Sequence, residues 1–134
     1  LDMFFEEGRE NVYKRHRVNA LAVQSACEKL GLECLVKDKA SRGVSVTSIK
    51  VPSGIDGKLL TKTMRVKYGV TVAGGQGKLT GLIFRIGHLG YVGIFDVIVA
   101  ISALEFALKE QGWNFDLGTG VNEVLKVFYE NNYM

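Results

Sequence analysis

One arginine stands inside an apolar stretch and is the residue best suited to bind a ligand. Arg85 lies in the segment 82–87, Leu-Ile-Phe-Arg-Ile-Gly, which has the composition of a buried strand. A guanidinium group keeps its charge in proteins, so burying it unpaired would cost several kcal/mol. Arg85 must therefore reach water, a carboxylate of the protein or a carboxylate of a ligand. The neighbouring Gly87 and Gly90 favour a ligand, because residues without a Cβ allow close approach, but an ion pair with one of the 14 acidic residues remains an alternative.

The glycine-rich stretch 74–79 does not have the spacing of a phosphate-binding loop. It reads Gly-Gly-Gln-Gly-Lys-Leu, whereas a P-loop requires Ser or Thr directly after Gly-Lys. Three residues separate Gly77 from Gly81, where the dinucleotide-binding fingerprint has two. We therefore expect a flexible, hairpin-like connection here.

Histidines and cysteines do not form a metal-binding or catalytic pattern. Neither His16 nor His88 lies three or four residues from a cysteine or from the other histidine, so we expect no metal site. Cys27 and Cys34 give no disulfide framework, and we expect two buried, reduced thiols. No serine has a nucleophile-elbow context and Cys27 has no nearby histidine, so we predict no catalytic residue in this chain.

A basic cluster at residues 14–17, Lys-Arg-His-Arg, raises the possibility of nucleic-acid binding. Glu10 precedes Lys14 by four residues, a spacing that suits pairing within a helix, and no aromatic residues interleave with the cluster. The net charge of +3 is also mild. We therefore expect a solvated helix face and no nucleic-acid partner.

Composition predicts one globular domain. The 134 residues are 47% hydrophobic and 23% charged. The longest apolar segment, 94–108, is interrupted by Asp96, Ser102 and Glu105, so no membrane helix and no membrane partner are predicted. No secretion signal opens the chain, and we expect a cytoplasmic location. The first residue is Leu1 rather than Met, which suggests a piece of a longer protein.

Periodicity predicts an α+β domain: a two-layer sandwich in which helices cover a small, mainly antiparallel sheet. Asp56 is expected to cap the second helix, and Gly31 and Gly69 to end the first and second. The predicted helices span residues 6–30, 56–67, 93–111 and 121–129, and the predicted strands span 34–36, 44–51, 70–73 and 82–86.

The same patterns predict which side chains face the core. In strand 44–51, we expect Val44, Val46, Ile49 and Val51 to point inward, with a bulge at Ser48. In helix 56–67, the predicted apolar face consists of Leu59, Leu60, Thr63 and Met64. Helix 93–111 is apolar except for a narrow stripe of Ser102, Glu105 and Lys109, so we expect it to be covered on more than one side.

Motifs spread over most of the chain occur in the order found in one known family. They are the segments 6–8, 15–17, 51–57, 68–70, 74–77 and 85–90, together with Asp96 and Leu104-Glu105. In these motifs the chain resembles the C-terminal small domain of the class V, fold-type I pyridoxal-phosphate aminotransferases. The similarity is to the alanine–glyoxylate and serine–glyoxylate branch, some members of which are labelled as the small, tritium-exchange subunit of a soluble hydrogenase.

The resemblance implies one domain over residues 1–134, with residues 1–30 forming the helix that links it to a large domain. In the family, the arginine of the Arg-Ile-Gly motif binds the substrate's α-carboxylate, and that residue is Arg85 here. The same motif contains Gly87, His88 and Gly90, for which the resemblance suggests a supporting role behind the arginine.

The family's cofactor-binding lysine, pyridine-nitrogen aspartate and phosphate-binding residues lie in the large domain, which this chain lacks. None of the chain's lysines has the family's cofactor-lysine context. The resemblance therefore implies pyridoxal phosphate in the full-length parent, and an isolated chain that neither binds it nor transaminates.

The parent is expected to be a homodimeric transaminase. It would move an amino group from alanine or serine to glyoxylate or a related 2-oxo acid, and the chain's other partner would be its own large domain. Two alternatives from other classes remain. One is a standalone interaction module or a subunit of a redox complex such as a soluble hydrogenase. The other is a regulatory domain that senses an amino acid through Arg85.

Overall fold

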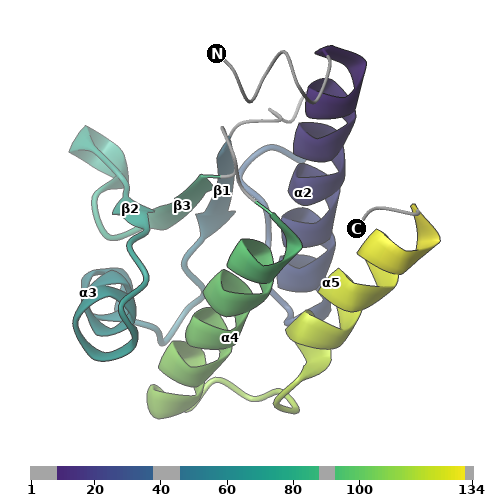
Figure 1. Cartoon of the computed structure of the whole chain (residues 1–134). Coiled ribbons are helices and arrows are strands. Elements are labelled where there is room, and N and C mark those ends of the chain that lie inside the picture. The colour runs from purple at the N-terminus through teal and green to yellow at the C-terminus, as the bar shows by residue number, and fades with distance from the viewer. Residues whose placement is uncertain (1–8, 38–45, 88–92, 132–134) are drawn as a thin grey trace.

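A three-stranded antiparallel sheet lies against long helices in this computed structural model, which describes residues 9–37, 46–87 and 93–131 (Figure 1). The central strand β3 (Ile83–Gly87) pairs with β1 (Val46–Lys50) on one side and with β2 (Ala73–Gly74) on the other. The sheet order is β1-β3-β2. The helices are α2 (Arg9–Lys29), α3 (Gly57–Tyr68), α4 (Ile94–Glu110) and α5 (Thr119–Glu130), and η2 (Gly77–Leu79) is a short 3-10 turn. The predicted α+β, two-layer class is confirmed.

The two ends of α3 are where the sequence predicts them. The Asp56 side chain accepts a hydrogen bond from the backbone N–H of Leu59 at 3.1 Å, and Gly69 ends the helix at φ +71°. Leu60 and Met64 are buried, but Leu59 is exposed, so the predicted apolar face is too wide. Helix α3 packs against α4, β2 and β3, and Gly57, Leu60 and Met64 are the residues that it buries.

The inward side of β1 differs from the prediction by one residue. Its register against β3 is continuous from Val46 opposite Gly87 to Lys50 opposite Ile83, without a bulge. Thr47 and Ile49 are buried, whereas Val46 is exposed. Side chains alternate strictly along a paired strand, so burying Ile49 against the core forces Thr47 inward and Val46 outward. Val44 lies outside the described residues.

Two of the short strands are also placed differently. Of the predicted strand 34–36, only Cys34 makes a bridge, to Ile49, although the backbone hydrogen bonds continue on both sides of it. β2 begins at Ala73, where the prediction has a strand from 70 to 73. The predicted antiparallel pairing of this edge with β3 is confirmed.

Helix α4 packs against α2, α3 and α5, which confirms that more than one of its sides is covered. Its predicted polar stripe is wrong, because Glu105 is only 2% exposed. The Glu105 carboxylate accepts hydrogen bonds from the backbone N–H groups of Gly118 at 2.5 Å and Val121 at 2.9 Å. It therefore caps the start of α5 from within another helix. The exposed side of α4 carries Phe95, Val99 and Phe106 instead.

The most extensive packing between two elements joins α2 and α5, which lie side by side although they are far apart in the sequence (Figure 1). Ala22, Val23 and Ala26 of α2 and Val124 and Phe128 of α5 are among the buried residues of this core. Both cysteines are buried and free, as predicted, and burial raises the pKa of the Cys27 thiol far above its usual range. No helix in the described ranges has the length and apolarity needed to span a bilayer.

Candidate functional site

Arg85 occupies the middle of the central strand. Its cross-strand partners are Ser48 of β1 and Ala73 of β2. Phe84 and Ile86, on either side of it along the chain, are buried in the core. Because successive side chains point to opposite faces, Arg85 lies on the face of the sheet turned away from that core. It is half-buried there, so its charge does not carry the full cost of an interior guanidinium.

One backbone carbonyl holds the guanidinium. The Nε and Nη2 atoms of Arg85 both donate to the carbonyl oxygen of Gly74, at 3.1 Å and 3.0 Å. Within the described part of the chain, no carboxylate pairs with Arg85, whereas Lys50 pairs with Glu33 and Lys67 with Glu110. The alternative of a structural ion pair finds no support among these residues.

The loop that supplies this carbonyl is tightly folded, although the sequence predicts a flexible connection. Backbone hydrogen bonds run from Gly75 to Ile83 at 3.1 Å, from Leu79 to Gln76 at 3.0 Å and from Leu82 to Leu79 at 2.9 Å. A Cβ added to Gly75 would lie 2.1 Å from the carbonyl oxygen of Leu79. Gly75 is therefore required by a close backbone approach.

The remaining predicted site residues are only partly described. Gly87 ends β3 on the same face as Arg85, and a Cβ added there would meet nothing within 4 Å. His88 and Gly90 lie outside the described residues. Sequence reasoning missed Gly74 as a partner of Arg85, because a contact made by a backbone carbonyl leaves no trace in residue type. It did single out the glycine stretch, but as a flexible, hairpin-like connection rather than as a partner of Arg85.

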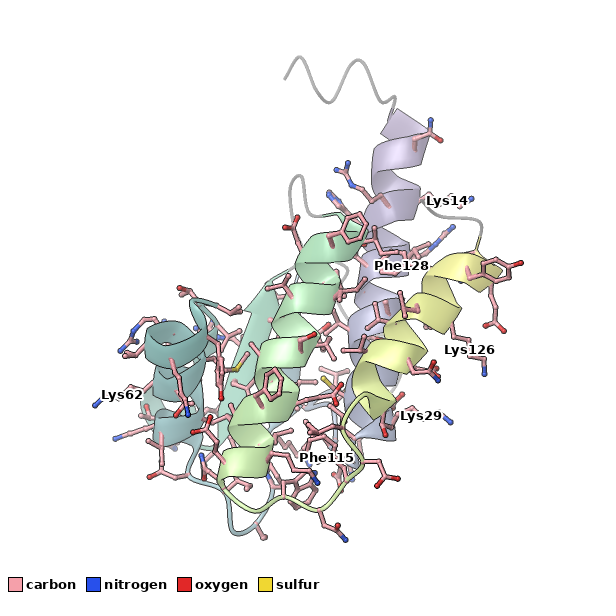
Figure 2. All side chains as sticks on the ribbon, turned by 60° about the horizontal axis from the view of Figure 1, so that its bottom comes forward. Lys14, Lys29, Lys62, Phe115, Lys126 and Phe128 are labelled. Carbon is pink, nitrogen blue, oxygen red and sulfur yellow. The ribbon has the colours of Figure 1, made fainter. Side chains whose placement is uncertain are left out.

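The described lysines do not have the surroundings typical of a lysine that binds an aldehyde cofactor. A lysine that binds such a cofactor normally sits in a desolvated pocket that lowers the pKa of its amine. Every described lysine is exposed except half-buried Lys50, which pairs with Glu33 at 3.6 Å. Lys14, Lys29, Lys62 and Lys126 point away from the body of the molecule in Figure 2.

The basic cluster at residues 14–17 differs from the solvated helix face that the sequence predicts. Lys14 and Arg17 are exposed, but Arg15 is 7% exposed, so the cluster is not a uniformly solvated face. Over the residues that the structure describes, no group of three or more His, Cys, Asp or Glu side chains could hold a metal ion.

Comparison with known sequences finds aminotransferases. No protein-family model matches the chain. An uncharacterized aminotransferase of Methanocaldococcus jannaschii is 44% identical over 113 residues, which cover 84% of this chain and 29% of that protein. The serine–glyoxylate aminotransferase of Hyphomicrobium methylovorum is 37% identical over 98% of this chain and 32% of its own length. The small subunit of a soluble hydrogenase of a Synechococcus species is 37% identical over 95% of this chain and 33% of its own length.

Solved structures agree with the sequences. The pyridoxamine–pyruvate aminotransferase of Mesorhizobium loti superposes with a TM-score of 0.91 at 30% identity, over 97% of this chain and 33% of that one. The fold is thus that of an aminotransferase small domain. Sequence and fold together identify the chain as homologous to the C-terminal domain of aminotransferases of the serine–glyoxylate and pyridoxamine–pyruvate type. It spans about a third of the length of the relatives it matches.

Proposed function

We propose that this domain is part of a pyridoxal-phosphate-dependent aminotransferase and that Arg85 binds the α-carboxylate of its substrates. The observation that carries the proposal is a half-buried guanidinium, on the open face of the sheet, whose protein partner among the described residues is a single neutral carbonyl. Two of its five N–H donors are used in this way, and the others are available to a ligand. A carboxylate fits such a planar fork through two parallel hydrogen bonds.

One arginine serves both halves of a transamination, because the amino acid and the 2-oxo acid carry the same α-carboxylate. Holding that group fixes the orientation of the reacting carbon, which is worth a large part of a reaction barrier. The cofactor supplies the chemistry at that carbon. Since the described lysines do not fit it, we assign cofactor binding to a part of the parent outside these 134 residues.

The donor is proposed to be serine or alanine and the acceptor glyoxylate or a related 2-oxo acid. The names of two relatives support this choice: the Hyphomicrobium protein is a serine–glyoxylate aminotransferase, and a structure from a Nostoc species, 30% identical with a TM-score of 0.76, is an alanine–glyoxylate aminotransferase. We further propose a homodimeric parent in the cytoplasm. The two reduced, buried cysteines are consistent with that compartment.

Steady-state kinetics of the full-length protein with Arg85→Ala test the role of Arg85. We expect kcat/KM to fall roughly 100-fold or more for both donor and acceptor, because each charge-assisted hydrogen bond is worth about 1.5–3 kcal/mol. Lys50→Gln is the matched control, since it removes a cation from the same face of the sheet, and it should leave the kinetics unchanged. Unchanged kinetics in Arg85→Ala would remove this residue from the substrate site.

The isolated chain is proposed to be inactive. Serine forms a Schiff base with free pyridoxal phosphate in solution, so the control is the mixture of pyridoxal phosphate, serine and glyoxylate without protein. Adding the chain should neither speed product formation nor change the absorption spectrum of that mixture. Faster product formation with the chain would show that it holds a cofactor site.

A redox subunit is the second candidate, and it is favoured by the soluble-hydrogenase names of relatives from Synechococcus and Anabaena cylindrica. The exposed Phe95, Val99 and Phe106 of α4 would suit a partner surface. Hydrogen-exchange activity of the purified full-length protein, in the absence of transamination, would favour this candidate. Transamination without hydrogen exchange would exclude it.

A further inference from the structure

We infer that the carbonyl of Gly74 is a positioning group for Arg85, that Gly75 sets its place, and that together they force a substrate carboxylate onto one edge of the guanidinium. The inference rests on the proposed role of Arg85 in binding that carboxylate. Beyond that role, the inference specifies which atoms of Arg85 bind the carboxylate and which residues determine this choice.

A guanidinium group offers two edges that can hold a carboxylate bidentately. The side edge consists of the Nε–H and one N–H of Nη2, and the end edge consists of one N–H from each of Nη1 and Nη2. Both atoms of the side edge of Arg85 donate to the Gly74 oxygen, at 3.1 Å and 3.0 Å. The side edge is therefore occupied, and the end edge is the one that can receive a carboxylate with two parallel hydrogen bonds.

The same carbonyl restricts how the side chain can move. A free arginine on a sheet surface samples many rotamers, and binding would have to order them. Two hydrogen bonds to one fixed acceptor hold the plane of the guanidinium before the substrate arrives. Pre-organisation of this kind favours affinity without adding any contact to the ligand.

The position of the carbonyl depends on Gly75. The Gly74 C=O and the Gly75 N–H belong to one planar peptide unit, so they move together. That unit is tied by the hydrogen bond from Gly75 to the carbonyl of Ile83, and the loop then folds back so that Leu79 lies over Gly75. A Cβ at Gly75 would lie 2.1 Å from the Leu79 oxygen and 2.9 Å from Ile83 Cγ1. Because backbone must shift to relieve such a contact, alanine at this position displaces the carbonyl.

Lys78, in the same loop, offers a matched control. It lies on the η2 turn and its side chain is exposed. Lys78→Ala therefore changes the loop while leaving Gly75 and the Gly74 carbonyl in place. Thr80→Val is a milder second test variant: it removes the 2.8 Å hydrogen bond from Thr80 Oγ1 to the Gly77 carbonyl, which helps to hold the η2 turn.

The experiment compares these variants in the full-length protein by two independent readouts. The first is the rate at which phenylglyoxal modifies Arg85, followed by mass spectrometry of the peptide, with and without propionate as an unreactive carboxylate. The second is steady-state kinetics with donor and acceptor. Thermal melting confirms that each variant is folded, and Thr80→Val carries the test if Gly75→Ala does not fold.

We expect Gly75→Ala to raise the KM of donor and acceptor together by about tenfold while kcat changes much less, because misplacing a positioning group weakens binding of the group it orients. Arg85 should also be modified faster in this variant and be protected less well by propionate. Thr80→Val should show the same changes at a smaller size, and Lys78→Ala should match the wild type in both readouts.

The outcomes separate this inference from the proposed function. The positioning role of the Gly74 carbonyl would be overturned if folded Gly75→Ala or Thr80→Val kept both the wild-type rate of Arg85 modification and the wild-type KM. Faster modification with unchanged KM would support the positioning of Arg85 but overturn its role in substrate binding. An equal loss in Lys78→Ala and Gly75→Ala would overturn the assignment to the Gly74 carbonyl, because the control leaves Gly75 and that carbonyl in place.

Discussion

Two charged residues, Arg85 and Glu105, stand in apolar segments of the sequence, and the structure treats them in opposite ways. At the junction of α4 and α5, Glu105 is 2% exposed and both of its carboxylate oxygens accept backbone N–H groups. On the outer face of the sheet, Arg85 is half-buried and, among the described residues, donates to one carbonyl only. A charge whose hydrogen bonds are all made inside the domain stabilises the fold, whereas a charge with donors left over is available to a ligand.

The comparison predicts that Glu105 matters most for stability. In Glu105→Leu, the N–H groups of Gly118 and Val121 lose their charged acceptor, and each hydrogen bond to a charged group contributes about 1.5–3 kcal/mol. We expect the free energy of unfolding to fall by about 3 kcal/mol or more. Urea denaturation measures this change, with the exposed Glu130→Gln as the control. If Glu105→Leu lowered the free energy of unfolding no more than Glu130→Gln does, Glu105 would not be a stabilising residue and its contrast with Arg85 would be wrong.

Gly120 offers a weaker test of the same junction. A Cβ at Gly120 would lie 2.9 Å from Ile101 Cγ2 and 3.1 Å from Glu105 Oε2. Gly120→Ala should destabilise the domain by about 1–2 kcal/mol, since overpacking outweighs the better helix propensity of alanine. Urea denaturation measures this change in the free energy of unfolding. A stabilised Gly120→Ala variant would show that the α4–α5 junction accommodates a methyl group without overpacking.

A third prediction concerns an exposed contact that joins α3 to α4. Lys67 Nζ donates to Glu110 Oε1 at 2.8 Å and Tyr68 Oη donates to Oε2, so Lys67 first and Tyr68 second lower the pKa of Glu110. The contribution of Glu110 to the free energy of unfolding is therefore fully present above the usual pKa of a glutamate. It is lost as the pH falls through the lowered pKa of the folded protein. Its hydrogen bonds in turn raise the pKa values of Lys67 and Tyr68, whose contribution is present below about pH 10 and is lost as the pH rises further.

Melting temperature measured against pH tests this contact. Glu110→Gln should flatten the acid and alkaline ends of the curve, with a smaller effect than either change at the α4–α5 junction, because surface ion pairs contribute little. Glu130→Gln again serves as the control. Curves of identical shape for Glu110→Gln and wild type would show that the contact does not contribute in solution.

Arg85 should have the smallest effect on stability. Gly74 is exposed, so water can replace the guanidinium at its carbonyl, and we expect Arg85→Gln to change the free energy of unfolding by no more than about 0.5 kcal/mol. A loss comparable to that of Glu105→Leu would mean that Arg85 is a structural residue, and the contrast between the two regions would disappear.

Much of the fold could be predicted because local signals and tertiary structure agree. Asp56 and Gly69 mark the two ends of α3, and the short connection before β3 requires an antiparallel pair. Arg85 was singled out because a cation in an apolar run is unusual enough to need a partner. The family resemblance is confirmed by relatives over almost the whole chain.

The failures have one physical origin: periodicity shows that a face exists, but not what covers it. The stripe of Ser102, Glu105 and Lys109 looks like a solvated side, yet α5 packs over Glu105 and leaves Phe95 and Val99 exposed. Val46 is more apolar than Thr47, yet the pairing of β1 with β3 sets their directions. The role of Gly74 depends on a backbone atom, and residue types alone do not report where such atoms lie.

The packing of α2 against α5 has a consequence for synthesis of the protein. Helix α2 ends at Lys29, but α5 begins only at Thr119, so the ribosome must add some ninety residues between them. At roughly 5–20 residues per second, that interval is several seconds or more. Throughout it, the apolar side of α2 around Ala22, Val23 and Ala26 lacks the helix that will cover it. The domain core can therefore close only after α5 has left the exit tunnel, and part of the apolar surface of α2 stays uncovered until then.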